Sequence, residues 1–308
     1  MWRIILRRIR GGIVFSSPVA LTGSSIFNSN GNAITLNDTV NGTQNLTLNA
    51  GSGAVTLSST LGNSNRLGVL SITGSAINAN NNITANQMTF TGPVVTAAGT
   101  FTYDSNSNNI DFTNTLTGAD TNLILNAGAG GDVTFANAVS LESLNTSANL
   151  ANVGSNITTD SGGITFSSPV TLTGNSTFNS TNSPIVLDAV NGTKTFTLNA
   201  GTSTVALNNP IGASTRLGAL DITGSAGITI NTASIKAAQM DMNSPVTLAA
   251  TTTLDSNGNA INLDDTVNAT AAGVQGLTLS GGAGAVTLTG ALGNCHSFGS
   301  FECDWQCH

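Results

Sequence analysis

The sequence is poor in the residues on which most catalytic and metal sites depend. Its 308 residues include only three cysteines and two histidines, and none of these five lies between Gly11 and Asn294. A serine or cysteine catalytic triad needs a histidine, and most transition-metal sites need histidine or cysteine ligands. Both kinds of site are therefore excluded from Gly11 to Asn294, and we predict no catalytic, cofactor-binding or metal residues.

Charged residues are also scarce, at 7% of the chain compared with roughly 25% in ordinary soluble domains. From Gly11 to Asn294 there are four basic and thirteen acidic residues, a net charge of −9. Nucleic acids and anionic membranes attract clustered lysine and arginine. We therefore expect no nucleic-acid partner and no direct membrane insertion.

Aromatic residues make up only 5% of the chain, and no stretch has the sustained i, i+3, i+4 apolar spacing of a helix. The sequence instead alternates apolar residues with threonine, serine or asparagine, as in Ile34-Thr35-Leu36 and Val55-Thr56-Leu57. This alternation places the apolar side chains on one face of a strand. Turn-forming stretches such as "SNGNA" from Ser29 bound the runs. The pattern predicts an all-β fold of short strands, three to five residues each.

The same segments recur along the chain. The stretch "GGIVFSSPVALTG" from Gly11 returns as "GGITFSSPVTLTG" from Gly162. Pro-Val pairs begin at Pro18, Pro93, Pro169 and Pro245, so they recur at a nearly constant interval. We predict four repeats of about 75 residues each, an interval that suits a repeat architecture. They span approximately 11–92, 93–168, 169–244 and 245–294, between a basic non-repeat leader at 1–10 and a non-repeat Cys/His tail at 295–308.

These repeats favour a solenoid over a propeller or a sandwich. A propeller blade usually has about 40–50 residues, and aromatic anchors are lacking here. Repeated asparagine and threonine suit stacked side-chain ladders. A turn of three short strands needs roughly 20–25 residues, which predicts about 12 to 15 turns. Because crossovers between parallel strands are almost always right-handed, we expect a right-handed parallel β-helix. Insertions such as "ATAAGVQ" after Asn268 should lie in loops.

Two stretches have the appearance of a calcium loop. In "DSNGNAINLDD" from Asp255, oxygen-bearing residues alternate, but the sixth-position glycine and the closing glutamate of an EF-hand are missing. The related "NSNGNAITLND" begins with Asn28. We interpret both as turns with stacked side chains, and the adjacent Asp264 and Asp265 as a turn pair.

The two ends differ from the repeats. "MWRIILRRIR" lacks the apolar core and cleavage site of a signal peptide, and is interpreted as the start of a fragment. A metal site in the tail fits no familiar zinc spacing, so we expect loose thiols on a truncated or frame-shifted end. The potential ligands there are Cys295, His296, Cys303, Cys307 and His308.

Two further features between Gly11 and Asn294 bear on function. A flat ice-binding face would need regularly spaced Thr-X-Thr segments, but those at Thr89, Thr171, Thr195 and Thr287 are irregularly spaced. Arg66 and Arg216 occupy equivalent positions in "RLGVLSITGSA" and "RLGALDITGSA", which indicates a structural role. The other two basic residues between Gly11 and Asn294 are Lys194 and Lys236.

Segments such as "RLGVLSITGSA" and "LTLNAGSGAVTL" resemble the β-strand repeats of filamentous-haemagglutinin-like exoproteins and autotransporter adhesins of Gram-negative bacteria. The resemblance covers nearly all of Gly11 to Asn294. It implies a right-handed parallel β-helix, export across the outer membrane, and roles in adhesion or surface display. It carries over no functional residue and no cofactor.

We therefore expect a non-enzymatic repeat segment of a secreted or surface-displayed bacterial adhesin, associated with the outer membrane. Its partners would be glycans or proteins of host or neighbouring cells, together with adjacent repeats of the same chain. Uncapped turns expose strand edges, so we also expect the isolated segment to self-associate. The alternative is a carbohydrate-active β-helix enzyme of the polysaccharide lyase or hydrolase type, which would need carboxylates clustered on one face.

Overall fold

The computed structural model describes residues 5–7 and 11–305, so part of the predicted leader and the last three residues of the tail lie outside it. The described chain is an all-β parallel β-solenoid of about 14 turns of about 21 residues. The predicted all-β parallel solenoid and its number of turns are confirmed. No helix in the described part of the chain has the length and apolar character needed to cross a membrane.

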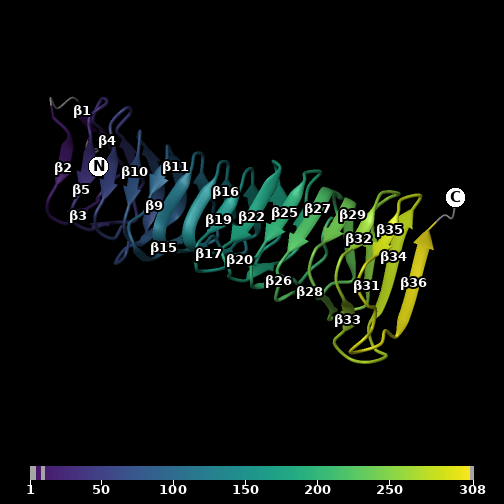
Figure 1. Cartoon of the computed structure of the whole chain (residues 1–308). Coiled ribbons are helices and arrows are strands. Elements are labelled where there is room, and N and C mark those ends of the chain that lie inside the picture. The colour runs from purple at the N-terminus through teal and green to yellow at the C-terminus, as the bar shows by residue number, and fades with distance from the viewer. Residues whose placement is uncertain (1–4, 8–10, 306–308) are drawn as a thin grey trace. The chain divides into compact units, whose positions relative to one another are not determined.

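The chain divides into two compact units, Met1–Asn152 and Val153–His308. In each unit, strands of consecutive turns pair in parallel and form three rows. Figure 1 labels many of these strands along the chain. β18 (Leu150–Val153) contains the division between the units. Each unit is described separately below.

In unit 1 every strand pairs with the strand one turn further along the chain. The first row contains β2 (Ile13–Phe15), β5 (Ile34–Leu36), β8 (Val55–Leu57), β10 (Ile77–Ala79), β12 (Val94–Val95) and the beginnings of β15 (Leu116–Asn126) and β17 (Val139–Ser147). The second row contains β3 (Val19–Ala20), β6 (Val40–Asn41), Leu61, Ile83, β13 (Gly99–Asp104) and the ends of β15 and β17. The third row contains β1 (Ile5–Arg7), β4 (Ser25–Asn28), β7 (Leu46–Asn49), β9 (Leu67–Thr73), β11 (Ile83–Thr91), β14 (Ile110–Phe112) and β16 (Asp132–Phe135).

Unit 2 is built in the same way. Its first row contains β19 (Ile157–Thr159), β22 (Ser176–Ser180), β25 (Phe196–Asn199), β27 (Leu217–Thr223), the end of β29 (Ser234–Met242), β32 (Ile261–Leu263) and β35 (Val286–Leu288). The second row contains β20 (Ile164–Phe166), β23 (Ile185–Leu187), β26 (Thr204–Leu207), β28 (Gly227–Ile230), β30 (Val246–Leu248) and β33 (Val267–Ala269). The third row contains β21 (Val170–Leu172), β24 (Val190–Asn191), Ile211, the beginning of β29, β31 (Thr252–Asp255), β34 (Gly276–Gly282) and β36 (Ser300–Trp305).

Four strands are much longer than the predicted three to five residues. β15 has 11 residues, and β11, β17 and β29 have nine each. These strands continue through a corner and so contribute to two rows of their unit. In β15 the corner is a register shift between Gly118 and Asn122, where a Cβ on Gly118 would lie 2.0 Å from the Thr96 hydroxyl oxygen. The alternation alone did not indicate that a strand would turn a corner.

The apolar residues of the alternating runs form the core. Each short strand buries alternate side chains, as in β5, where Ile34 and Leu36 are fully buried on either side of Thr35. Because the strands of successive turns pair in register, side chains at equivalent positions of these strands stack in columns. In unit 1, Phe90, Phe112 and Phe135 stack with ring centroids 5.0 and 5.8 Å apart.

A tyrosine joins this aromatic column. The Tyr103 ring stacks beside Phe90 and Phe112, and its hydroxyl donates a hydrogen bond of 2.9 Å to the Ala79 carbonyl oxygen. Burial raises the pKa of Tyr103. The hydroxyl is therefore a neutral structural donor inside the core of unit 1.

Asparagine side chains connect successive turns at the corners. The Oδ1 atom of Asn41 accepts the backbone N–H groups of Ser64 and Asn65 at 2.9 and 3.3 Å. Similar bonds join Asn45 to Val69, Asn82 to Thr102, Asn156 to Thr177, Asn175 to Thr195, Asn182 to Thr202, Asn191 to Ser214 and Thr215, and Asn268 to Cys295. These N–H groups lie where the strand ladder is interrupted, so the asparagines satisfy donors that would otherwise depend on water. This explains why the corners are rich in asparagine.

A buried serine marks a second type of corner. Ser29, Ser105, Ser180 and Ser256 are each completely buried, and each hydroxyl donates to the carbonyl oxygen three residues further on. A residue with positive φ follows within two positions in every case: Asn30, Asn106, Asn182 and Asn257. The predicted loop insertion after Asn268 is also present, as exposed residues 270–274 between β33 and β34.

Replacement of Phe112 by alanine should lower the free energy of unfolding of the protein by about 3–5 kcal/mol, because it removes the middle ring of a buried stack. Phe112 is 1% exposed, whereas Val69 in the same unit is 39% exposed. Val69→Ala is therefore the matched control and should cost less than about 1 kcal/mol. Urea unfolding followed by circular dichroism measures both, and equal losses would contradict the stabilising role of the buried aromatic stack.

Candidate functional site

The most highly organised polar groups in the chain are two arginine clamps. Arg66 of unit 1 donates from Nη1 to the carbonyl oxygens of Ala85 and Asp104, at 3.1 and 2.7 Å. Its Nη2 atom lies 3.1 Å from the Asp104 carboxylate. Ala85 and Asp104 are 19 and 38 residues further along, so one side chain connects three consecutive turns.

Arg216 of unit 2 repeats this arrangement. Its Nη1 atom donates to the carbonyl oxygens of Ala237 and Asp255, and its Nη2 atom donates to the Asp255 carboxylate at 2.6 Å. Both arginine side chains are 27% exposed. The structural role predicted for Arg66 and Arg216 is therefore confirmed, and neither guanidinium is free to bind a substrate carboxylate.

The clamp also determines the charge state of Asp255. Burial acts to raise the pKa of Asp255, but the hydrogen bonds from Arg216 and the Asn257 amide oppose it, as do the charges of Arg216 and Lys236. The net result is a pKa below the ordinary carboxyl value of 3.8. Because Asp255 binds Arg216 and the Asn257 N–H, its carboxylate already has partners in the stretch that resembles a calcium loop and was interpreted as a turn.

Two carboxylate pairs are formed by adjacent turns. Asp221 and Asp241 face each other in register on β27 and β29, and Asn243 donates to Asp221 at 2.7 Å. Burial, together with the charge of Asp241, raises the pKa of Asp221 against the hydrogen bond from Asn243. Asp111 behaves similarly: burial and the charge of Asp132 raise its pKa, and a hydrogen bond to Thr134 opposes this.

Sequence reasoning missed these pairs, although the signal was present. The two members of each pair are separated by about one turn of about 21 residues. Across residues 5–7 and 11–305, no group of three or more histidine, cysteine, aspartate or glutamate side chains is placed to hold a metal ion. Asp264 and Asp265 lie in the predicted turn between β32 and β33.

The threonine segments do not form a regular face, as their irregular spacing indicated. Thr89 is in register with Ser71 and Asp111, Thr171 with Asn191, and Thr287 with Asn262. Thr195 lies in a corner and its backbone N–H donates to Asn175. The Thr-X-Thr segments therefore do not stack on one another, and a regular ice-binding array through them is contradicted by the register.

The tail contributes a strand to unit 2. β36 pairs with β34, with Phe301 over Leu277 and Cys303 over Leu279. Cys295 is exposed, and burial together with the negative charge of Asp304 raises the pKa of the Cys303 thiol. Both are free thiols, whereas Cys307 and His308 lie outside the described residues.

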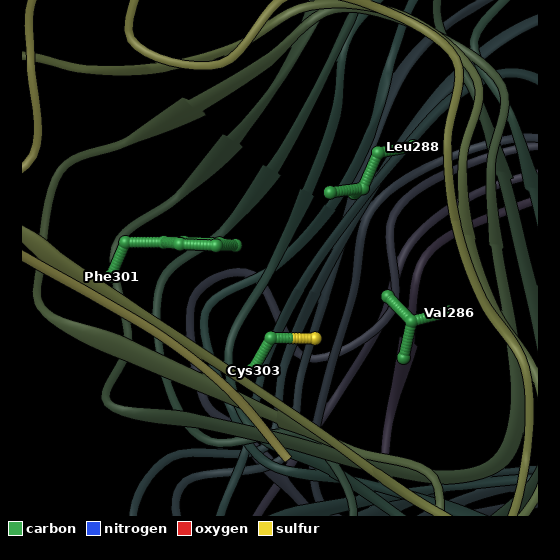
Figure 2. Close-up of a pocket in the computed structure, with 4 residues that line it drawn as sticks. All are labelled: Val286, Leu288, Phe301 and Cys303. Carbon is green, nitrogen blue, oxygen red and sulfur yellow. The ribbon is translucent and has the colours of Figure 1, made fainter. Parts of the chain in front are cut away.

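A pocket of about 280 Å³ lies beside this strand, lined by Val286, Leu288, Phe301 and Cys303. Figure 2 shows the four side chains around a common space. Val286 and Leu288 continue the columns of buried Ile261 and Leu263. In the described part of the chain, no strand stacks on the outer edge of β35 or β36, so the pocket is the uncovered end of the apolar core. It offers apolar contact and no acid–base pair.

In comparisons with known proteins, no family model, no curated protein and no solved structure matches this chain. What the structure supports of the resemblance to filamentous-haemagglutinin-like repeats is the parallel β-solenoid fold.

Replacement of Arg216 by alanine should lower the free energy of unfolding by about 1–3 kcal/mol, because charge-assisted bonds across three turns are lost from a partly exposed site. Arg66→Ala should have a similar effect. Lys194, whose side chain has no hydrogen bond or ion pair with another described residue, supplies the control Lys194→Ala, which should be near neutral. If all three substitutions lowered the free energy of unfolding in urea by equal amounts, the clamp interpretation would be contradicted.

Carboxylates with shifted pKa values should respond in opposite directions when neutralised. The pKa of Asp255 is lower in the folded chain than in the unfolded chain, so its charge stabilises the fold above the ordinary value and loses this effect as the pH falls through the folded pKa. Asp255→Asn should therefore destabilise the protein at neutral pH. The pKa of Asp221 is higher in the folded chain than in the unfolded chain, so its charge destabilises the fold at neutral pH. Asp221→Asn should therefore stabilise the protein at neutral pH.

Thermal unfolding at neutral and acidic pH measures this difference, with Asp264→Asn as the control for loss of one exposed charge. The two effects should decrease as the pH falls below the carboxyl value of 3.8, and the effect of Asp255→Asn should vanish only below its lowered folded pKa. Stabilisation by both Asp255→Asn and Asp221→Asn at neutral pH would indicate general charge repulsion instead.

Proposed function

We propose that this chain is a structural and adhesive segment of a secreted or surface-displayed bacterial adhesin, associated with the outer membrane. It acts as a stalk and as a multivalent contact surface, without enzymatic activity. Its partners are glycans or proteins on host or neighbouring cells. The solenoid is right-handed, because parallel crossovers almost always are, and consists of about four units of about 75 residues.

The observation that carries the proposal is how the few charged groups are used. The paired arginines and aspartates hold turns together, while the outward positions of the rows are mainly small and uncharged. In unit 1, Thr35 and Thr56 stack in register, and Asn78 donates to Thr56. In unit 2, Thr229 and Thr247 also stack in register. Such a surface offers many similar weak contacts, which favours binding through multivalency.

The repeated corners support the longer repeat unit. The buried serines Ser29, Ser105, Ser180 and Ser256 follow one another at the same nearly constant interval as the four Pro-Val pairs. Arg66 and Arg216, which begin the two clamps, are separated by about twice that interval. The interval is not a whole number of turns of about 21 residues.

One observation favours a second candidate, the carbohydrate-active enzyme. Asp221 and Asp241 lie on adjacent strands, which are about 4.8 Å apart in a sheet, and the pKa of Asp221 is raised. A carboxyl group with a raised pKa beside a second carboxyl group is the arrangement used by glycosidases. The amide partners Asn243 and Asn262 weigh against it, because they already occupy an oxygen of each carboxylate.

The proposal predicts binding that depends on display density. The intact chain, coupled to beads at increasing density, should bind epithelial or bacterial cells about 100-fold or more better than the same amount of soluble chain, measured by flow cytometry. The variant Thr229→Asp/Thr247→Asp should bind less well, since it adds charge to one outward row. Beads carrying an unrelated acidic protein control for non-specific adhesion.

Absence of density-dependent binding to every cell type tested would overturn the adhesin proposal. In parallel, the chain is incubated with acidic and neutral polysaccharides, and reducing ends are measured. Cleavage that is lost in Asp221→Asn but retained in Asp264→Asn would establish the enzyme instead.

A further inference from the structure

Four Asn-Gly dipeptides occur in the chain, at Asn30-Gly31, Asn41-Gly42, Asn191-Gly192 and Asn257-Gly258. Asn-Gly is chemically labile, because the glycine backbone nitrogen can attack the asparagine Cγ atom with little steric hindrance. The reaction needs a free nitrogen nucleophile and a side-chain amide that can rotate into reach. The structure divides the four dipeptides into two classes by these requirements.

Two of the dipeptides are held by the adjacent turn. Asn41 Oδ1 accepts the N–H groups of Ser64 and Asn65, and the Gly42 nitrogen donates to the Asn65 carbonyl oxygen at 3.2 Å. Both the amide and the attacking nitrogen are therefore fixed. In unit 2, Asn191 makes the same bonds to Ser214 and Thr215, and the Gly192 nitrogen donates to the Thr215 carbonyl oxygen at 3.2 Å.

The other two dipeptides lie at exposed corner tips. Asn30 and Asn257 are exposed and have φ values of 52° and 54°. Their backbone N–H groups bind the preceding Asn28 and Asp255 side chains. Within the described residues, neither asparagine side chain makes a hydrogen bond, and neither following glycine nitrogen donates one. A Cβ placed on Gly258 would have no atom within 4 Å, so that tip has room to rearrange. At the other tip, a Cβ on Gly31 would lie 2.9 Å from the Ser52 hydroxyl oxygen, and this hydroxyl donates to the Gly31 carbonyl oxygen but leaves the Gly31 nitrogen free.

We propose that Asn257-Gly258 and Asn30-Gly31 are sites of spontaneous deamidation in the folded protein, and that Asn41-Gly42 and Asn191-Gly192 are protected by the solenoid. The glycine nitrogen loses its proton and bonds to Cγ, and the side-chain nitrogen leaves as ammonia. Water then opens the resulting succinimide at either carbonyl and leaves aspartate or isoaspartate. The balance is one water consumed and one ammonia released, with no change of oxidation state.

The chemical result is a new carboxylate at each tip, on a chain with few charges. The isoaspartate product also lengthens the backbone at a corner where the φ of Asn257 is left-handed. The tips therefore acquire charge with age, while the corners that join one turn to the next keep their amides. This inference depends on the local geometry only, and is independent of the proposed adhesive function.

Incubation of the intact folded chain at mildly alkaline pH, followed by peptide mass mapping in ¹⁸O-labelled water, tests the proposal. The tip sites should convert at least about 30-fold faster than the held sites. Reaction at a held site must first break about two hydrogen bonds of about 1 kcal/mol each, and this cost corresponds to about 30-fold in rate. In concentrated urea all four sites should convert at similar rates, because their dipeptide chemistry is identical. Asn257→Gln should remove the label at that position and leave the label at Asn30.

Similar rates at all four sites in the folded chain would overturn the proposal, as would faster conversion at Asn41 or Asn191. Unequal rates that persist in urea would also overturn it, because the difference would then lie in the local sequence. Circular dichroism before and after incubation verifies that the chain stays folded during the measurement.

Discussion

The fold depends on the pairing of each turn with the next through parallel strands. A strand of three residues has too few hydrogen bonds and too little apolar area to be stable alone, so every turn depends on its neighbours. This requirement explains why apolar positions recur about every 21 residues and why the core consists of columns such as Phe90, Phe112 and Phe135. It also explains why asparagines reach to the following turn at corners where the strand ladder is interrupted.

The scarcity of charge follows from the same constraint. Outward side chains in consecutive turns are about 4.8 Å apart, so like charges in register repel each other. At Asp221, burial is the main cause of the raised pKa, and the charge of Asp241 in register adds to it. Uncharged polar side chains can stack without this penalty. Two of the four basic residues between Gly11 and Asn294 are used where opposite signs meet: Arg66 and Arg216 each bind carbonyl groups of two further turns as well as a carboxylate.

The alternation of apolar residues and the recurrence of turn motifs were sufficient to predict the all-β class, the parallel solenoid and its number of turns. The role of Arg66 and Arg216 followed from their equivalent positions. Strand lengths were underestimated, because a strand such as β15 bends at Gly118 without leaving the extended conformation. The Asp221–Asp241 pair was missed although its members are separated by about one turn, because the longer repeat does not show which residues of successive turns stack.

Related corner segments lie in different rows within each unit. In unit 1, β4 leads into the Ser29 corner from the third row, whereas β13 leads into the equivalent Ser105 corner from the second. In unit 2, β22 and β31 are separated in the same way. Within each unit the second copy of the motif is therefore rotated about the axis of that unit relative to the first copy. Deleting or duplicating one copy would redirect every side chain beyond it, even though the local sequence stayed the same.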